Sequence, residues 1–137
     1  MIYKKNWKYI LIKEDSFLRT LTKLNYYRLK ALKNFLDVKR GDIGGYIQHY
    51  YNLSQSGKCW VYGNAWVCDG ARVSENAVVC ENAFVEGNAK VYGNAKITGN
   101  ARVLGTTIVK NNTVICKDTI IDNNIIITGK SLKIDDI

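Results

Sequence analysis

Residues 57–128 read GKCWVY GNAWVC DGARVS ENAVVC ENAFVE GNAKVY GNAKIT GNARVL GTTIVK NNTVIC KDTIID NNIIIT, one six-residue phrase repeated twelve times without an insertion. A short fixed period predicts a solenoid, in which each repeat adds one unit to a stack. Loops that carry chemistry would have to interrupt such a period. None do, so the stretch predicts a rigid scaffold.

Two positions of the phrase are restricted, as expected of a strand with one packed face and one free face. The third position is small in almost every repeat, from Cys59 to Thr119, before Ile125 ends the series. The fifth position is Val or Ile throughout, from Val61 to Ile127, and β-branched residues suit strands. We predict an all-β fold in which both positions point inward, and in which Gly or Asn at the start of each repeat forms a corner.

The phrase GNAxV at this spacing resembles the hexapeptide-repeat family, whose fold is a left-handed parallel β-helix with three strands per coil. The resemblance implies regular coils at 57–74, 75–92, 93–110 and 111–128 within a β-helix spanning 39–134. Residues 39–56 then form an irregular opening coil. Continuing the period backwards predicts that Ile43, Ile47 and Leu53 point inward.

Residues 27–65, YRLKALKNFLDVKRGDIGGYIQHYYNLSQSGKCWVYGNA, resemble the leading segment of hexapeptide-repeat proteins from bacteriophages and prophages. The likeness covers about residues 26–104 and rests on YRLKAL, GDIGGY, NLS and GNA together. It implies a phage-type protein that works in the cytoplasm of a bacterial host.

The chain ahead of the repeat is basic and aromatic. Residues 1–40 hold 11 Lys/Arg against 3 Asp/Glu, which accounts for the whole net charge of +8. Leu18, Leu21, Leu24 and Leu32 allow a helix in residues 1–38, whereas Tyr27, Leu29 and Ala31 alternate with Arg28, Lys30 and Leu32 as in a strand. The resemblance implies strands near 8–13, 17–23 and 26–32, and we expect these residues to form a β-rich cap on the open end of the helix. Its basic and aromatic side chains are the predicted partner-binding residues, for nucleic acid or an acidic protein surface, with plain solubility as the alternative. They are Lys4, Lys5, Trp7, Lys8, Arg19, Arg28, Lys30, Lys33, Lys39 and Arg40.

Candidate catalytic residues are few. His49 is the single histidine, and an inward or corner position is the simpler interpretation for it than a general base. Cys59 falls in the inward ladder, whereas Cys68, Cys80 and Cys116 fall on outward sixth positions as small surface or interface residues. No CxxC or histidine cluster is present. We predict no metal, no cofactor and no enzymatic activity.

Two of the three outer faces are too apolar for free surface, since continuous exposed apolar patches usually mark contacts. We predict a homo-oligomer, a trimer or a dimer, because related β-helices commonly associate in closed rings. The alternative is that the head folds back over one face. The predicted interface residues are Trp60, Tyr62, Trp66, Val78, Phe84, Val114 and Ile120.

Three functions compete at this point. The leading hypothesis is a non-enzymatic binding protein that inhibits a host defence system, in the manner of an anti-CRISPR protein, by binding a host protein or ribonucleoprotein. The second is a hexapeptide-family acyltransferase that uses His49. The third is a structural protein that polymerises end to end. No segment reaches the roughly 18 apolar residues of a membrane span, so no membrane partner is expected.

Overall fold

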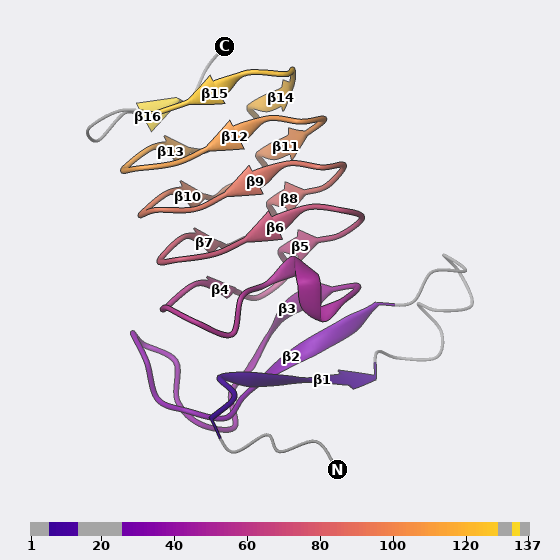
Figure 1. The fold of residues 1–137 in the computed structure, drawn as a ribbon, viewed down its shortest axis with the longest axis vertical. Helices are drawn as coiled ribbons and strands as arrows, with labels where there is room; N and C mark the ends of the chain where they lie inside the picture. The colour runs from indigo at the N-terminus through magenta and orange to yellow at the C-terminus, as the bar shows by residue number, and fades with distance from the viewer. Residues whose placement is uncertain (1–5, 14–25, 129–132, 135–137) are drawn as a thin grey trace.

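The computed structural model describes residues 6–13, 26–128 and 133–134, and in these residues the chain is built almost wholly of short strands. Figure 1 shows a stack of flat coils with the N-terminal strands at one end and β15 and β16 at the other. The chain therefore folds as a parallel β-solenoid, as the repeat predicts.

Three strands make each coil of the stack. Strand pairs align residues eighteen positions apart, as between Trp60 and Val78 or Lys96 and Val114. The predicted three-strand coil is thus confirmed, while its left-handed sense stays a prediction. The coil strands are β4 (Trp60–Val61), β5 (Trp66–Val67), β6 (Arg72–Val73), β7 (Val78–Val79), β8 (Phe84–Val85), β9 (Lys90–Val91), β10 (Lys96–Ile97), β11 (Arg102–Leu104), β12 (Ile108–Val109), β13 (Val114–Ile115), β14 (Ile120–Asp122) and β15 (Ile126–Ile127).

The interior consists of the side chains at the third and fifth positions of the phrase, as the repeat predicts. All fifth positions from Val61 to Ile127 are buried, and so are the third positions from Cys59 to Thr119. Small third residues leave room for the branched fifth residues of the same layer, which gives close packing without voids. Ile125 departs from the pattern, since it is 44% exposed at the last corner instead of lying inside.

The corners hold the first residue of the phrase in a left-handed conformation. Gly63 and Gly87 have φ values of 56° and 69°, as expected for glycine. Acidic residues adopt the same conformation at Glu75 and Glu81, each with φ of 58°. A carboxylate compensates for the strain, because Glu75 accepts a hydrogen bond from the N–H of Gly93, one coil further on, at 2.7 Å.

The opening coil runs out of register with the rest. Ile47 pairs with Val67 and Leu53 pairs with Val73, so equivalent residues stand twenty positions apart rather than eighteen. Ile47 and Leu53 are fully buried, as predicted. Ile43 is 47% exposed, so its predicted inward position is wrong. The extra length lies between Leu53 and Val61, where the corner at residues 54–58 is enlarged.

The N-terminal residues form a cap that continues one sheet of the solenoid. Strand β1 (Tyr9–Lys13) pairs antiparallel with β2 (Tyr27–Ala31), and β2 pairs antiparallel with β3 (Ile43–Ile47). Strand β3 then lies parallel to β5, which gives a seven-stranded sheet in the order β1-β2-β3-β5-β8-β11-β14. The predicted strands near 8–13 and 26–32 are confirmed, and the one at 17–23 lies outside the described residues.

The cap closes the end of the coil interior. Tyr9, Leu29 and Ala31 are fully buried and belong to the same apolar core as the coil residues. The enlarged corner supports them, because the side chain of Gln55 pairs with strand β1 as a neighbouring strand would. Its Oε1 accepts hydrogen bonds from the N–H groups of Lys8 and Tyr9, and its Nε2 donates to the carbonyl of Tyr9.

Two sheets complete the molecule, β16-β13-β10-β7-β4 and β15-β12-β9-β6. Strand β16 (Lys133–Ile134) places Lys133 opposite Val114, where the repeat predicts Leu132. A 3₁₀ turn, η1 (Tyr50–Asn52), lies in the opening coil. None of the described elements is a helix long and apolar enough to cross a membrane.

Candidate functional site

A row of stacked planar side chains runs along the outer face of the seven-stranded sheet. The rings of Tyr46, Trp66 and Phe84 come from the paired strands β3, β5 and β8 and lie nearly parallel. The centroids of Tyr46 and Trp66 are 4.3 Å apart, and those of Trp66 and Phe84 are 5.9 Å apart. Parallel pairing in register forces this arrangement, because it places each residue directly beside its equivalent in the next coil.

A guanidinium group covers each end of the row. Arg28 lies 4.6 Å from the ring centroid of Tyr46, and Arg102 lies 5.4 Å from that of Phe84. Arg28 is fixed further by hydrogen bonds to the carbonyl oxygens of Gly44 and Gly63. We call Arg28, Tyr46, Trp66, Phe84 and Arg102 the stacked row.

The geometry limits what the stacked row can recognise. The faces of its rings already pack against one another, so an incoming base finds no free face on which to stack. Tyr26 packs edge-on against Trp66 with a centroid distance of 4.4 Å, so part of the row is covered. Tyr46, Trp66 and Phe84 remain partly exposed as an apolar strip between the two guanidinium groups, of which Arg102 is paired with Glu86. Ile120 extends the strip at β14 with 60% of its surface exposed. Such a strip is suited to apolar or acidic groups of a protein.

The residues predicted to bind a partner differ in their exposure to solvent. Lys30, Lys33, Lys39 and Arg40 are exposed, whereas Lys4, Lys5 and Arg19 lie outside the described residues. Trp7 is half-buried, with its ring edge-on to that of Tyr50 at 5.3 Å. Arg28 belongs to the stacked row.

The prediction that Lys8 contacts a partner is wrong, because this residue is only 3% exposed and cannot touch a partner directly. Its ammonium donates to the carbonyl oxygens of Gly57 and Cys59 and to the Cys59 sulfur, at 3.3, 2.7 and 3.2 Å. Burial lowers the pKa of Lys8 from its ordinary value. The side chain of Lys8 is therefore part of the joint between cap and coil.

The residues of the predicted oligomer interface fall into two groups, those covered by the cap and those on the outside. Trp60 is 1% exposed and lies under the cap, edge-on to Phe35 and Tyr9, so it is not an outward residue. Tyr62 is tied to the cap as well, since its hydroxyl donates to the Asp37 carboxylate at 2.7 Å. The alternative in which the head folds back over one face is thus correct for the start of that face. Trp66, Val78, Phe84 and Val114 are half-buried on the outside, and Ile120 is exposed.

His49 lies at the surface, not inside the coil. It lines a depression of about 410 Å³ with Leu11, Tyr27, Gln48 and Tyr50. Its backbone is fixed in the turn η1, because the His49 carbonyl accepts from the N–H of Asn52 at 3.0 Å and the His49 N–H donates to the Asn52 side-chain oxygen at 2.9 Å. Among the described residues, no carboxylate is hydrogen-bonded to the imidazole ring to orient it as a general base.

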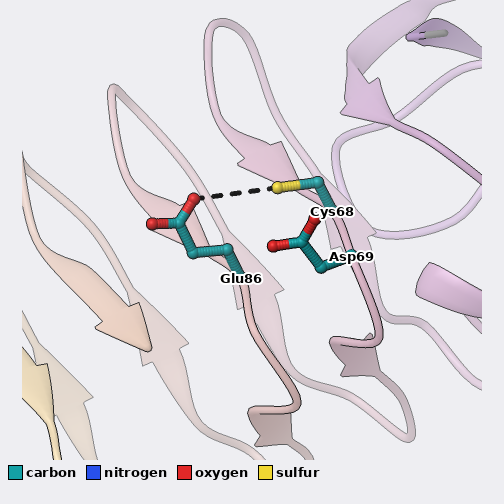
Figure 2. A group of neighbouring side chains, drawn as sticks. All are labelled: Cys68, Asp69 and Glu86. Carbon is teal, nitrogen blue, oxygen red and sulfur yellow. Dashed lines mark hydrogen bonds between the residues drawn. The ribbon is translucent and has the colours of Figure 1, made fainter. Parts of the chain in front are cut away.

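Cys68, Asp69 and Glu86 bring three metal-ligating groups together at one corner, with their ligand atoms within 4.8 Å of one another. Figure 2 shows the Cys68 thiol directed toward Glu86, at 3.9 Å, with Asp69 beside it. Cys68 is buried rather than at the surface as predicted. Burial, and then the carboxylates of Asp69 and Glu86, raise the pKa of its thiol to about 12.

The chemistry of this corner follows from that raised pKa. The thiol of Cys68 stays protonated at neutral pH, so it is a poor nucleophile. A thiophilic divalent cation could accept one sulfur and two carboxylate ligands, but it would have to displace the thiol proton. It would also compete with Arg102, which forms an ion pair with Glu86 at 2.7 Å.

The strand pairing puts Trp66, Phe84, Arg102 and Ile120 on a common face, and the predicted interface includes three of them, Trp66, Phe84 and Ile120. The sequence did not reveal Tyr46 or Arg28 as members of the row, because counting back by eighteen sets Gln48 beside Trp66. The same count sets Cys68 beside Glu86, and that was the available signal for the second cluster.

No protein-family model matches this sequence, and no curated protein matches it either.

Proposed function

We propose that this chain is a non-enzymatic binding protein of the phage type, in which the solenoid holds a rigid outer surface against a protein or ribonucleoprotein of a bacterial host. The most specific form of the proposal is that it inhibits a host defence system. The single observation that carries the binding role is the stacked row, a fixed apolar strip with a guanidinium at each end. Aromatic and arginine side chains are enriched in the energetically dominant parts of protein interfaces.

The rigidity of this strip favours binding. Each member of the stacked row is held by its neighbours, and Arg28 is additionally held by two backbone carbonyls. Little side-chain entropy is left to lose on association, which is one of the main costs of forming an interface. The exposed Lys30 on the adjacent strand β2 adds positive charge beside the strip, so we expect the partner surface to be acidic or to carry nucleic acid.

A pull-down from bacterial lysate with the full chain tests this proposal. Phe84→Lys should abolish capture, because it removes the ring between Trp66 and Arg102 at a repeat position where Lys90 and Lys96 show that lysine is tolerated. The matched control is Val78→Lys, the same change on another sheet, which should leave capture intact. Nuclease treatment of the lysate separates a ribonucleoprotein from a protein partner. Recovery of no defence component or nucleic acid, or equal capture by both variants, would contradict the proposal.

Self-association is a further part of the proposal. Ile120 on the seven-stranded sheet and Ile126 on the sheet β15-β12-β9-β6 are each 60% exposed, and burying such groups in a closed ring would remove apolar area from water. Light scattering of the full chain should give the mass of a dimer or trimer. A monomer at micromolar concentration would overturn the oligomer without affecting the pull-down.

A further inference from the structure

A cavity of about 380 Å³ lies where the cap meets the enlarged corner at residues 54–58. Its volume falls at the small end of the range for ligand sites, roughly 300–1,000 Å³. The walls come from segments far apart in the chain. They are Asn6 and Lys8 just before β1, Lys33 and Asn34 after β2, and Ser56 in the corner. The cavity is separate from the stacked row, because no residue of that row lines it.

The cavity contains the buried ammonium of Lys8, with which no carboxylate of the described residues forms an ion pair. The three groups around the Lys8 ammonium are two backbone carbonyls and the Cys59 sulfur, with the ring of Phe35 at 5.5 Å. The ion pair found among the described residues is Arg102 with Glu86, far along the sheet. A buried charge is normally paired, and leaving one uncompensated is unfavourable.

A second lysine adds to the positive field of the cavity. Lys33 lines the same space, is exposed, and lies close enough to oppose protonation of Lys8. The two ammonium groups therefore repel one another across the cavity. An anion between them would relieve that repulsion and supply the missing compensation for Lys8.

Neutral donors complete the lining. The Oδ1 of Asn34 already accepts the backbone N–H of Arg40 at 2.8 Å, which leaves its amide hydrogens to face outward from that bond. Asn6 and Ser56 add an amide and a hydroxyl. Several donors spread around a lysine suit a tetrahedral oxyanion, whereas a planar carboxylate is better matched by the fork of an arginine.

We infer that this cavity binds a phosphate group. Lys33, Asn34, Asn6 and Ser56 would donate to its oxygens, and Lys8 would contribute through its field, since its own hydrogens already point at Gly57 and Cys59. The phosphate could arrive as a free ion or small ester, or as the terminal phosphate of a nucleic acid. The inference does not depend on the function proposed above, because it concerns a different surface.

Calorimetry with sodium phosphate at fixed ionic strength tests the site in the full chain. Phosphate should bind the wild type, and Lys33→Ala should weaken binding by about tenfold or more, because a charged hydrogen-bond donor is lost. The matched control is Lys90→Ala, which removes one exposed positive charge from β9 outside the cavity and should change the affinity less than about twofold. In parallel, phosphate should raise the pKa of Lys8 measured by NMR of its side chain.

A pair of oligonucleotides, identical except for a 5′-phosphate, separates the two sources. If the 5′-phosphate improves affinity at least about tenfold and Lys33→Ala removes that gain, the ligand is the end of a nucleic acid. If inorganic phosphate binds but the 5′-phosphate adds nothing, the ligand is free phosphate or a small ester. No phosphate-specific heat, or equal losses in Lys33→Ala and Lys90→Ala, would overturn the inference.

Discussion

The regular coils and the capped end solve the same problem, burial of a narrow apolar interior, in opposite ways. In the coils each residue packs on its own equivalent one coil away, so one short phrase specifies every contact. In the cap, unlike residues from distant parts of the chain meet, as Lys8 meets Cys59 and Gln55 meets Tyr9. Repetition gives a scaffold with similar contacts in every coil, and distinct sites arise where the repetition stops.

The largest expected effect comes from filling the interior of a regular coil. Ala95→Trp places a large ring at a fully buried third position and should lower the free energy of unfolding by about 3 kcal/mol or more through overpacking. Lys96→Trp is the control, since Lys96 is exposed on the outside of β10. Urea unfolding measures both variants, and unchanged stability of Ala95→Trp would mean that the inward assignment is wrong.

Breaking the cap should have a smaller effect, confined to one end. Gln55→Ala leaves the N–H groups of Lys8 and Tyr9 and the Tyr9 carbonyl without their side-chain partner. We expect a loss of about 2–3 kcal/mol. Hydrogen exchange should show lost protection at Lys8 and Tyr9 but not in β10. The control Lys58→Ala alters an exposed side chain of the same corner, and an equal loss there would contradict the role given to Gln55.

The buried thiol of Cys68 predicts a specific alkaline destabilisation. Its pKa is raised to about 12 in the folded chain from an ordinary value of 9.0, so between these values the folded state holds a proton that the unfolded state has lost. The free energy of unfolding should fall with rising pH by up to about 1.4 kcal/mol per pH unit over this range. Cys68→Ser should remove that part of the slope, which urea unfolding at pH 9 to 11 would measure. Identical slopes in the two proteins would show that Cys68 is not the group responsible.

The smallest effects concern the corners and sharpen the comparison within the regular coils. Glu81 has φ of 58°, and its carboxylate accepts the N–H of Gly99 at 3.1 Å. Glu81→Ala keeps the strained conformation and loses the hydrogen bond, so it should cost about 1 kcal/mol, whereas Glu81→Gly should stay within about 0.5 kcal/mol of the wild type. Thermal melting ranks the two. Gly99→Ala should lower the melting temperature more than either Glu81 variant, because the added Cβ would lie 2.7 Å from the backbone nitrogen of Lys117.

The regular coils were predictable because their contacts follow from one period. A residue such as Val79 finds its neighbours by adding or subtracting eighteen, and strand pairing confirms them. The exceptions occur at the end of the repeat. Ile125 stands at the last corner with nothing regular above it, and β16 slips by one residue against β13.

The capped end was predictable only in outline. Alternating residues in 27–31 gave a strand, and the open coil end demanded a cover, but no period locates Lys8 against Cys59. A count that assumes eighteen residues in every coil cannot detect the two extra residues before Val61. That one shift exposes Ile43, brings Tyr46 instead of Gln48 beside Trp66, and sets Arg28 on Tyr46. The stacked row and the cavity at the enlarged corner therefore depend on a local length that the repeat does not encode.

The support that Gln55 gives to strand β1 has a consequence for biosynthesis. Chains are made from the amino end, and Lys8 precedes Gln55 by 47 residues. Strand β1 therefore cannot complete its hydrogen bonds until the corner at residues 54–58 has been made, and contacts over such separations form slowly. The strand must wait for a partner that is synthesised 47 residues later. During that interval its apolar face is open to whatever the nascent chain meets.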